Sequence, residues 1–543
     1  MDAASAARTI VGRRTVASTL EHRARVDAEK TFLIFEDDLG EVSSWTYGSF
    51  NQTVNRVAGG LSRLGVRKGE RINLHMTNRP EFLFFWFAAA KLGAVMVPTN
   101  PLSPPDELAY PLGHSKAVAT VTLPHLLDNV LAARRRCPSV RNVIVCGLPA
   151  DEAASAPGPG EPGVVDFSEL CSRQTDRPPG IDHDPLDDVA ILYTSGTTSR
   201  PKGVMVTNAN YVFLGEQISK NVGLTPDDRW LVTLPLFHGN AQYYSVMTAL
   251  TVGASLAIMS RFSASRLMRQ AAKHGCTVHS SLATPLRMVL AQKPLETDAL
   301  SGLRLVIFAQ SLTPEQYDEW DRRYGVPLLQ IFGMTETMGQ PLVNPLNYRR
   351  DHSTIGLPAM GYECRVVDEN GRDMPAGEAG QLIVSGIPGV TIMRGYLRDP
   401  ENTERSLRDG WLWTGDVVRV GDDGYFHFLD RARELIRRSG ENISAGEVEA
   451  VLKSHPAVED AAVIGLPDDM YDESVNAFVV LAEGASASGD EIMDFCRARL
   501  SKFKVPGSID FRDDFPRTST GKVRKIELKE AALAALRRDT DGA

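Results

Sequence analysis

The sequence predicts an α/β protein: a large, multi-layered N-terminal αβ domain built on parallel sheets, followed by a small, mobile α+β domain. Two observations carry this prediction. Apolar runs of strand length alternate with helical patterns over most of the chain, which favours parallel strands with helices packed on both faces. The pattern then changes after about residue 430. The elements expected in the first part include strands at 189–194, 303–308 and 328–332 and helices at 211–221 and 314–324.

Each of these elements has a local signal. Residues 189–194 (VAILYT) form an apolar run of the length and composition of a buried strand. The helix at 211–221 follows the polar pair Thr207-Asn208, which favours a helix start. The helix at 314–324 begins with Pro314, and proline is preferred in the first turn because its missing N–H has no partner there.

The C-terminal part is expected to fold as a separate α+β domain. Short strands are expected at 461–464 and 477–481, then a helix at 490–500 and a final helix rich in Lys, Leu and Ala. A unit of about 110 residues is of normal domain size. We therefore predict one domain at residues 1–429 and a second, lid-like domain at residues 430–543.

Composition excludes some functions. The chain of 543 residues is 43% hydrophobic and 23% charged, as expected of a globular protein with a large core. Its net charge of −9 gives no support for nucleic-acid binding. The longest apolar run, 82–90, is far shorter than the roughly 20 residues that cross a bilayer. We expect no secretory signal, because no apolar segment follows Arg8.

The cysteines indicate a cytoplasmic protein. Six of them are scattered without a CxxC pair, which favours a reducing cytoplasm over a disulfide or zinc framework. We expect a cytoplasmic protein without a membrane span, which could form a homodimer. The cysteines are Cys137, Cys146, Cys171, Cys276, Cys364 and Cys496.

The most informative segment is 193–203 (YTSGTTSRPKG), where a predicted strand runs into a loop of small hydroxyl residues and glycine before Lys202. Small residues let backbone N–H groups approach phosphate oxygens, and hydroxyls add further donors. It differs from the Walker P-loop, whose lysine follows glycine directly, because here Pro201 precedes the lysine. The segment predicts a phosphate site, and a flexible surface turn is the alternative.

Further motifs follow in a fixed order along nearly the whole chain. They are FGMTE (332–336), WTGD (413–416), DR (430–431) with GENI (440–443), and PRTSTGK (516–522). Together with 193–203 they resemble the adenylate-forming superfamily of acyl-CoA synthetases, peptide-synthetase adenylation domains and luciferases. TTSRPK (197–202), GMTETM (333–338) and IPGVT (387–391) are similar to the crotonobetaine/carnitine–CoA ligase branch.

The resemblance implies an ATP-dependent ligase that activates a small carboxylic acid as acyl-AMP, releases pyrophosphate and forms a thioester with coenzyme A. Thr335 would contact the α-phosphate of ATP, and Glu336 would orient Mg²⁺, which shields the phosphate charge. The predicted holders of the β- and γ-phosphates are Thr194, Ser195, Gly196, Thr197, Thr198 and Lys202.

The same resemblance assigns the nucleoside contacts. Asp416 would accept the ribose hydroxyls, a role that suits an ionised carboxylate, and Arg431 would add a second ribose contact. Phe332, followed by Gly333, would lie against adenine where the family usually has Tyr. Without the resemblance, Asp416 would be interpreted as a turn residue and Arg431 as a solvated charge.

Lys522 is the expected catalytic lysine. A flexible ammonium can bridge the substrate carboxylate and the α-phosphate in the transition state. The alternative is an exposed loop lysine among basic neighbours.

The resemblance also implies that His238, in PLFHG (235–239), is a catalytic residue, because it matches the family's active-site histidine beside the acyl pocket. A lone histidine is otherwise most often a satisfied core residue. The segment FAQS (308–311) departs from the family's usual Gly-Gly/Ala-Ala-Pro, which leaves efficiency open. The other residues predicted for the pocket are Gly239, Ala283, Ala309, Gln310 and Met338.

The C-terminal domain would supply the coenzyme A side. The loop RSGENIS (438–444) is similar to the acyl-CoA synthetase version, in which Gly440 leaves room for the pantetheine arm. Arg433 would be the hinge between two lid orientations. Three alternatives remain: an acyl-AMP ligase that loads a carrier protein, an enzyme strong in one half-reaction, and a silent nucleotide-binding regulator. The predicted coenzyme A contacts are Ser439, Gly440, Glu441 and Asn442.

Overall fold

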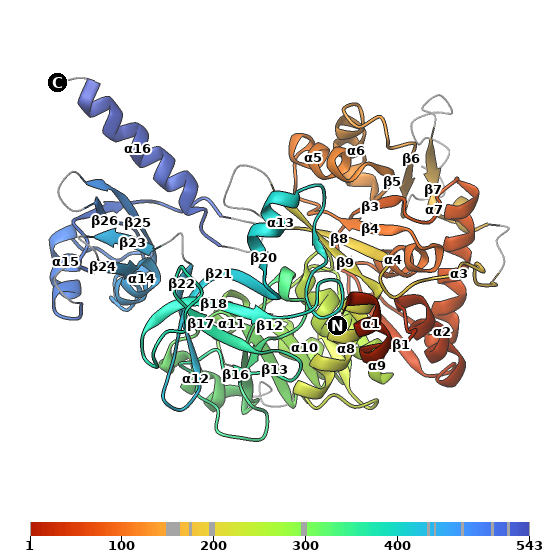
Figure 1. Ribbon diagram of the computed structural model, residues 1–543, viewed down its shortest axis with the longest axis horizontal. Coiled ribbons are helices and arrows are strands. Elements are labelled where there is room, and N and C mark those ends of the chain that lie inside the picture. The colour runs from red at the N-terminus through yellow and green to blue at the C-terminus, as the bar shows by residue number, and fades with distance from the viewer. Residues whose placement is uncertain are drawn as a thin grey trace. The chain divides into compact units, whose positions relative to one another are not determined.

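The computed structural model describes residues 2–147, 163–172, 176–194, 201–294, 301–431, 435–438, 441–468, 472–500, 504–517 and 522–541. The chain forms two compact units (Figure 1). Unit 1 contains residues 1–364 and 384–412, and unit 2 contains residues 365–383 and 413–543. The predicted α/β class with parallel sheets and a small C-terminal domain is confirmed. The domain boundary between residues 429 and 430 stays a prediction.

The first sheet of unit 1 has eight strands in the order β19-β9-β8-β4-β3-β5-β6-β7. Its strands are parallel except for β9, which runs antiparallel to β8, and β19, which runs antiparallel to β9. The strands are β3 (Arg71–His75), β4 (Val95–Pro98), β5 (Ala117–Thr122), β6 (Asn142–Val145), β7 (Val164–Asp166), β8 (Asp188–Thr194), β9 (Lys202–Thr207) and β19 (Gly395–Tyr396).

The second sheet has nine strands in the order β16-β15-β14-β13-β12-β10-β11-β1-β2. Its central strands, from β14 to β1 in that order, are all parallel. The strands are β1 (Thr31–Glu36), β2 (Val42–Thr46), β10 (Arg229–Val232), β11 (Ser255–Met259), β12 (Val278–Leu282), β13 (Leu305–Ala309), β14 (Leu328–Phe332), β15 (Leu342–Val343) and β16 (Leu357–Pro358).

Helices accompany both sheets (Figure 1), and their ends match the sequence signals. Thr207 and Thr313 cap α8 and α12 through their side chains, each in a capping box. The α-helices of unit 1 are α1 (Ala3–Ile10), α2 (Val16–Val26), α3 (Tyr47–Arg63), α4 (Pro80–Leu92), α5 (Pro105–Ser115), α6 (Leu127–Arg134), α7 (Phe167–Cys171), α8 (Asn208–Asn221), α9 (Met247–Val252), α10 (Leu267–Lys273), α11 (Ala283–Leu290), α12 (Pro314–Tyr324) and α13 (Pro400–Ser406).

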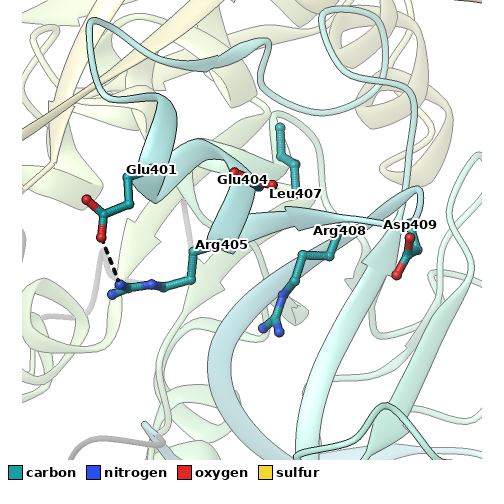
Figure 2. Close-up of a pocket in the computed structure, with 6 residues that line it drawn as sticks. All are labelled: Glu401, Glu404, Arg405, Leu407, Arg408 and Asp409. Carbon is teal, nitrogen blue, oxygen red and sulfur yellow. Dashed lines mark hydrogen bonds and ion pairs between the residues drawn. The ribbon is translucent and has the colours of Figure 1, made fainter.

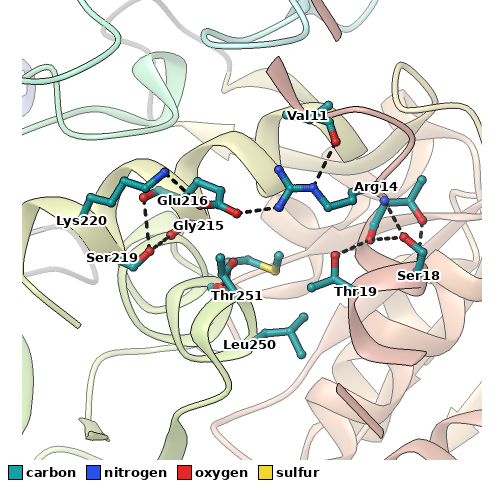
Figure 3. A network of polar contacts seen from close by, with 12 residues as sticks. Val11, Arg14, Ser18, Thr19, Gly215, Glu216, Ser219, Lys220, Leu250 and Thr251 are labelled. Atoms are coloured by element: carbon teal, nitrogen blue, oxygen red, sulfur yellow. Dashed lines mark hydrogen bonds and ion pairs between the residues drawn. The ribbon is translucent and has the colours of Figure 1, made fainter. Parts of the chain in front are cut away.

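The N-terminal segment is tied to α8 by a polar network (Figure 3). The Arg14 guanidinium donates to the carbonyl oxygen of Val11 at 3.1 Å and lies 2.5 Å from Glu216. Lys220 approaches the other carboxylate oxygen of Glu216 at 3.1 Å. The first helices are therefore part of unit 1.

Two small sheets consist mainly of residues of unit 2. In the first sheet, β18 (Ala379–Ser385) lies between β17 (Cys364–Val367) and β21 (Trp411–Val420). Strand β21 also pairs with β22 (Phe426–Arg431), and its first residues pair with β20 (Leu407–Arg408). The other is predominantly antiparallel and packs on helices. It contains β23 (Leu435–Arg438), β24 (Glu441–Ser444), β25 (Val458–Asp468), β26 (Asp472–Leu481) and β27 (Ser508–Phe511), with α14 (Ala445–Lys453), α15 (Gly489–Arg497) and α16 (Lys525–Asp541).

Candidate active site

Four neighbouring parallel strands of unit 1 end at the predicted nucleotide and acyl residues. Leu282 of β12 pairs with Ala309 of β13, and Phe308 pairs with Gln330 of β14. The carboxyl ends of parallel strands lie at one edge of a sheet, where open α/β sheets bind their ligands. The predicted residues that end or follow β10, β12, β13 and β14 are His238, Gly239, Ala283, Ala309, Gln310, Phe332, Gly333, Thr335, Glu336 and Met338.

Glu336 is a buried carboxylate beyond the end of β14. It lies in the short 3₁₀ helix η4 (Thr335–Thr337) and is 5% exposed. The Tyr396 hydroxyl donates to its Oε1 at 2.9 Å, and the Met393 N–H donates to its backbone carbonyl at 2.9 Å. Burial, and then the negative charge of Glu336, raises the pKa of Tyr396. The tyrosine therefore stays a neutral donor that fixes the carboxylate.

Lys202 reaches the same tyrosine from the neighbouring strand. Tyr396 of β19 pairs with Val204 of β9, and β9 begins at Lys202. The Lys202 Nζ lies 4.3 Å from the centre of the Tyr396 ring, a geometry in which the ring's π face attracts the cation. The structure thus places a cation over the ring of Tyr396 and a carboxylate at its hydroxyl.

The phosphate loop itself is described only at its two ends. Thr194 ends β8, and its Oγ1 donates to the Lys202 carbonyl oxygen at 3.4 Å. The predicted phosphate contacts Ser195, Gly196, Thr197 and Thr198 lie outside the described residues.

The turn after β14 requires glycine at its start. A Cβ on Gly333 would lie 2.5 Å from the Tyr244 hydroxyl and 3.0 Å from the Gly339 carbonyl oxygen. Met338 has φ +63° and ψ −65°, and the Gly339 N–H donates to the Thr337 carbonyl at 2.7 Å. This is a γ-turn, which is rare and strained for a residue with a side chain. Strain of this kind is concentrated at functional sites.

A π-helix carries tyrosines that sequence analysis missed. Residues Ala241–Val246 (η2) follow His238 and Gly239, and π-helical turns are frequent at functional sites. The Tyr243 hydroxyl donates to the Thr335 carbonyl at 3.5 Å. A Cβ on Gly239 would lie 3.0 Å from the Tyr243 ring, so this predicted pocket glycine allows the close approach. Tyr243 and Tyr244 both lie outside the motifs quoted in the sequence analysis, and a π-helix has no sequence signal of its own.

The turn after β13 is also strained. Gln310 has φ +77°, and the next residue, Ser311, is held from two sides. The Gln330 amide donates to the Ser311 hydroxyl at 3.4 Å, and Arg287 donates to the Ser311 carbonyl at 2.7 Å. The departure FAQS at 308–311 is thus supported by contacts from β14 and α11.

His238 and Ala283 frame the predicted acyl end. Ala283 is fully buried at the start of α11, whereas His238 and Ala309 are half-buried. The His238 ring packs against Phe237, with 4.2 Å between ring centres. The role of this group in binding an acid stays a prediction.

In unit 2 the two predicted ribose contacts are strand partners. Asp416 of β21 pairs with Arg431 of β22. Asp416 is 2% exposed, and its N–H is bonded to the Thr414 hydroxyl at 3.1 Å. The side chain of Arg431 lies outside the described residues. Two residues that are fifteen positions apart in the sequence are thus strand partners.

Lys522 is exposed and directly precedes a backbone bridge between Arg517 and Val523. The predicted coenzyme A contacts Ser439 and Gly440 and the predicted hinge Arg433 lie outside the described residues. Glu441 and Asn442 start β24, but their side chains are likewise not described.

The residues present fit Mg²⁺ bound together with substrate phosphates. Among the described residues, no group of three or more His, Cys, Asp or Glu side chains could hold a metal by itself. Mg²⁺ is usually bound by one or two carboxylates with substrate phosphates and water, not by an all-protein cage. Glu336, with one oxygen held by Tyr396, suits that mode.

A surface hollow elsewhere in unit 1 contains none of the predicted site residues (Figure 2). Its main contact is an exposed ion pair between Glu401 and Arg405 at 3.3 Å. The hollow is lined by Glu401, Glu404, Arg405, Leu407, Arg408 and Asp409.

Comparison with known proteins identifies the family. The AMP-binding enzyme model matches residues 20–397, and the AMP-binding enzyme C-terminal domain model matches residues 447–522. The chain belongs to the AMP-binding enzyme family. A relative from Salmonella agona (strain SL483), crotonobetaine/carnitine–CoA ligase, is 37% identical over 527 residues, which cover 96% of this chain and 100% of the relative.

Solved structures of CoA ligases are similar to this chain over nearly its whole length. The anthranilate CoA ligase AuaEII in complex with anthranoyl-AMP is 27% identical with a TM-score of 0.87, covering 97% of this chain and 98% of that one. The o-succinylbenzoate coenzyme A synthetase of Bacillus subtilis, in complex with ATP and magnesium, is 27% identical with a TM-score of 0.81, covering 94% and 99%.

The predicted activity is thereby confirmed. The protein is an ATP-dependent acyl-CoA synthetase, an acid–thiol ligase that uses ATP, Mg²⁺ and coenzyme A. Among the described residues, none of the helices combines the length and apolar character needed to cross a membrane.

Proposed function

We propose that this acyl-CoA synthetase activates, at the strand ends of unit 1, a monocarboxylic acid that carries no charge other than its carboxylate. A different loop of the C-terminal domain would complete each half-reaction. In the first step a carboxylate oxygen attacks the α-phosphorus of ATP, and pyrophosphate leaves. In the second, the coenzyme A sulfur attacks the acyl carbon, and AMP leaves. The thiol proton is released to solvent.

The contact of Tyr396 with both Glu336 and Lys202 is the observation that carries this proposal. Phosphoryl chemistry needs positive charge where negative charge develops and a carboxylate to hold the metal ion. Lys202 and the loop from Thr194 would hold the β- and γ-phosphates. Glu336 would hold Mg²⁺, which neutralises phosphate charge when bound, and Thr335 would contact the α-phosphate.

The nucleoside would be held by Phe332 and Gly333 in unit 1 and by Asp416 and Arg431 in unit 2. The pairing of Asp416 with Arg431 supports a shared ribose role, because both residues sit at one register position. A buried carboxylate accepts hydroxyl hydrogen bonds strongly.

The C-terminal domain, residues 430–543, would alternate between two orientations about Arg433. In one, Lys522 would bridge the acid carboxylate and the α-phosphate; in the other, the loop 439–442 would admit the pantetheine arm. The test is to assay the half-reactions separately, with pyrophosphate exchange for the first and thioester formation from pre-made acyl-AMP for the second. Gly440→Leu should block only the second step, because a branched side chain would fill the pantetheine path. Normal saturation with coenzyme A in this variant would contradict the assignment.

The acid is proposed to be uncharged apart from its carboxylate. In the described segments 233–240, 283–286, 310–312 and 333–340, which follow the four strands, Glu336 is the only acidic or basic residue apart from His238. Arg287, one turn into α11, is exposed and binds the Ser311 carbonyl. A buried charge on the acyl group would need a partner that these segments do not offer.

This proposal separates acids of similar size. AMP release should be fastest with uncharged aliphatic or aromatic monocarboxylates and slow with carnitine, which carries a permanent positive charge, or with malonate, which carries a second carboxylate. Preference for carnitine or malonate would contradict it. The relative from Salmonella agona is named for carnitine and crotonobetaine, so that enzyme assayed beside this one is the matched positive control.

We also propose that the protein works in the cytoplasm as a homodimer. The six unpaired cysteines support a reducing compartment. Mass photometry of the purified chain tests the dimer, and a monomer at micromolar concentration would contradict it.

A further inference from the structure

Two ion pairs hold the ends of the segment that carries Lys522. Before it, the Arg517 Nη2 lies 2.6 Å from the Asp460 Oδ2. After it, the Lys525 Nζ lies 2.7 Å from the Glu449 Oε1. The two acidic partners lie on regular elements of unit 2: Asp460 on β25 and Glu449 on α14.

Each acid has a second contact that fixes it. The other oxygen of Asp460 lies 2.7 Å from the Lys453 Nζ. Although burial alone would raise it, Lys453 and Arg517 hold the pKa of Asp460 below its usual value. Glu449 also accepts the backbone N–H of Val463 at 2.7 Å. Both carboxylates are therefore fixed on the element pair α14 and β25.

The backbone closes between these two pairs. Arg517 and Val523 form an antiparallel bridge, and the Arg524 N–H donates to the Pro516 carbonyl at 2.7 Å. Lys522 is the residue directly before the bridge. Lys522 is therefore adjacent to the bridge residue Val523 and lies between the two ion-paired residues, Arg517 and Lys525.

These pairs differ from ordinary surface ion pairs. Exposed pairs contribute little, because solvent screens them and two long side chains lose freedom. The pair Arg497–Asp494 on α15 is of that kind, with side chains 56% and 72% exposed. The side chains of Asp460 and Arg517 are 17% and 34% exposed, and those of Glu449 and Lys525 are 15% and 18% exposed.

We propose that Asp460 and Glu449 are positioning residues for Lys522. They touch neither substrate nor reacting atoms; they hold the two ends of the lysine-bearing segment so that its ammonium reaches the same place in every turnover. The inference rests on the proposed role of Lys522 in adenylation. A displacement of about 1 Å in a reacting group can cost about 100-fold in rate, so a clamp of this kind affects the rate more than binding.

The test uses Asp460→Asn in the full chain, with Asp460→Glu as the conservative variant and Asp494→Asn as the matched control on an exposed pair. We expect the adenylation kcat of Asp460→Asn to fall about 10- to 100-fold, with KM for ATP and acid little changed. Thioester formation from pre-made acyl-AMP should stay normal. Asp460→Glu should recover most of the rate, and Asp494→Asn should equal wild type.

A second measurement does not depend on activity. Hydrogen exchange at the Arg524 amide should become at least about 10-fold faster in Asp460→Asn, because loss of the pair frees the bridge, and should stay unchanged in Asp494→Asn. Unchanged exchange, or equal loss in both half-reactions, overturns the inference. If Lys522→Ala spares adenylation, the proposed role of the lysine fails instead, and the exchange measurement still decides whether the clamp exists.

Discussion

In unit 1 the acidic residue of the predicted site, Glu336, is buried and held by a neutral tyrosine that also contacts Lys202. In unit 2 the predicted catalytic cation, Lys522, is exposed and lies between two residues, Arg517 and Lys525, that are held by ion pairs. A buried, pre-formed arrangement suits a site that must hold the phosphates of ATP and a metal ion during adenylation. An exposed lysine on an anchored segment suits a charge that is needed in one step and withdrawn in the next. The contrast predicts a division of roles in adenylation: unit 1 would hold the phosphates and the metal ion, and unit 2 would supply the transition-state cation.

Lys522→Ala tests the unit 2 side of this contrast. The activation free energy of adenylation should rise by at least ~3–4 kcal/mol, the cost of losing one transition-state donor. Transfer of the acyl group from pre-made acyl-AMP to coenzyme A should keep its wild-type rate. Pyrophosphate exchange and thioester formation measure the two steps. Lys529→Ala is the matched control, because it removes a lysine that forms a half-buried ion pair with Glu473 in the same unit. Equal loss in both steps would assign Lys522 a structural role.

Glu336→Gln tests the unit 1 side. The amide oxygen can still accept the hydrogen bond from Tyr396, but the negative charge that would bind Mg²⁺ is lost. We therefore expect the activation free energy of adenylation to rise by about 2–3 kcal/mol. The expected signature is a higher Mg²⁺ requirement in a titration of pyrophosphate exchange. Glu216→Gln, which removes a charge from the N-terminal network, should leave that titration unchanged. An unchanged Mg²⁺ curve in Glu336→Gln would remove the carboxylate from the metal site.

Unit 1 also contains a buried carboxylate, Glu36, that is not among the predicted site residues. Glu36 contacts the His274 ring at 2.6 Å, the Lys273 Nζ at 2.9 Å and the Gln270 amide at 2.9 Å. Burial alone would raise its pKa, but these hydrogen bonds lower it from 4.5 to about 2. Glu36→Gln should therefore lower the free energy of unfolding by about 2 kcal/mol at pH 7.

The pH dependence of that loss has a definite sign. A pKa lowered by folding gives stability that is present above pH 4.5 and is lost as the pH falls towards about 2. The difference between wild type and Glu36→Gln should thus shrink over that window, as measured by urea denaturation with fluorescence of the buried Trp86, Trp230 and Trp320. A difference that is constant with pH would mean that packing, not charge, sets the effect.

Much of the fold and part of the site could be predicted because their signals are local. The strand expected at 328–332 is β14, the helix expected at 314–324 is α12, and the strand expected at 189–194 is β8 with one more residue. Apolar runs, Pro314 and the capping threonine before it act within a few residues. The motif FGMTE likewise marks the end of β14 directly.

The contacts that complete the site could not be predicted, because they join distant segments. Tyr396 lies sixty positions after Glu336, in a two-residue strand outside the motifs quoted in the sequence analysis. Asp460 meets Arg517 across 57 positions. The γ-turn at Met338 depends on the surrounding chain, since methionine has no intrinsic preference for positive φ. Local patterns fix which residues carry the chemistry, and tertiary packing fixes what holds them.

Tyr396→Phe is the smallest and most specific test of the unit 1 arrangement. The change keeps the aromatic ring, so the contact with the Lys202 ammonium at 4.3 Å is preserved. It removes only the hydroxyl that donates to Glu336 at 2.9 Å. A buried carboxylate that loses one donor is destabilised by about 1–2 kcal/mol, so kcat/KM for adenylation should fall about 5- to 30-fold, while thioester formation from acyl-AMP is unchanged.

Tyr396→Leu separates the two contacts of this residue, because it removes the ring as well as the hydroxyl. If the ring helps to place Lys202, Tyr396→Leu should weaken ATP binding in addition, with a higher KM for ATP that Tyr396→Phe does not show. Equal kinetics in the two variants would mean that the hydroxyl alone matters and that Lys202 is placed by its strand. Wild-type kinetics in both would mean that Glu336 is held without Tyr396, and unit 1 would then lose the pre-formed geometry that distinguishes it from unit 2.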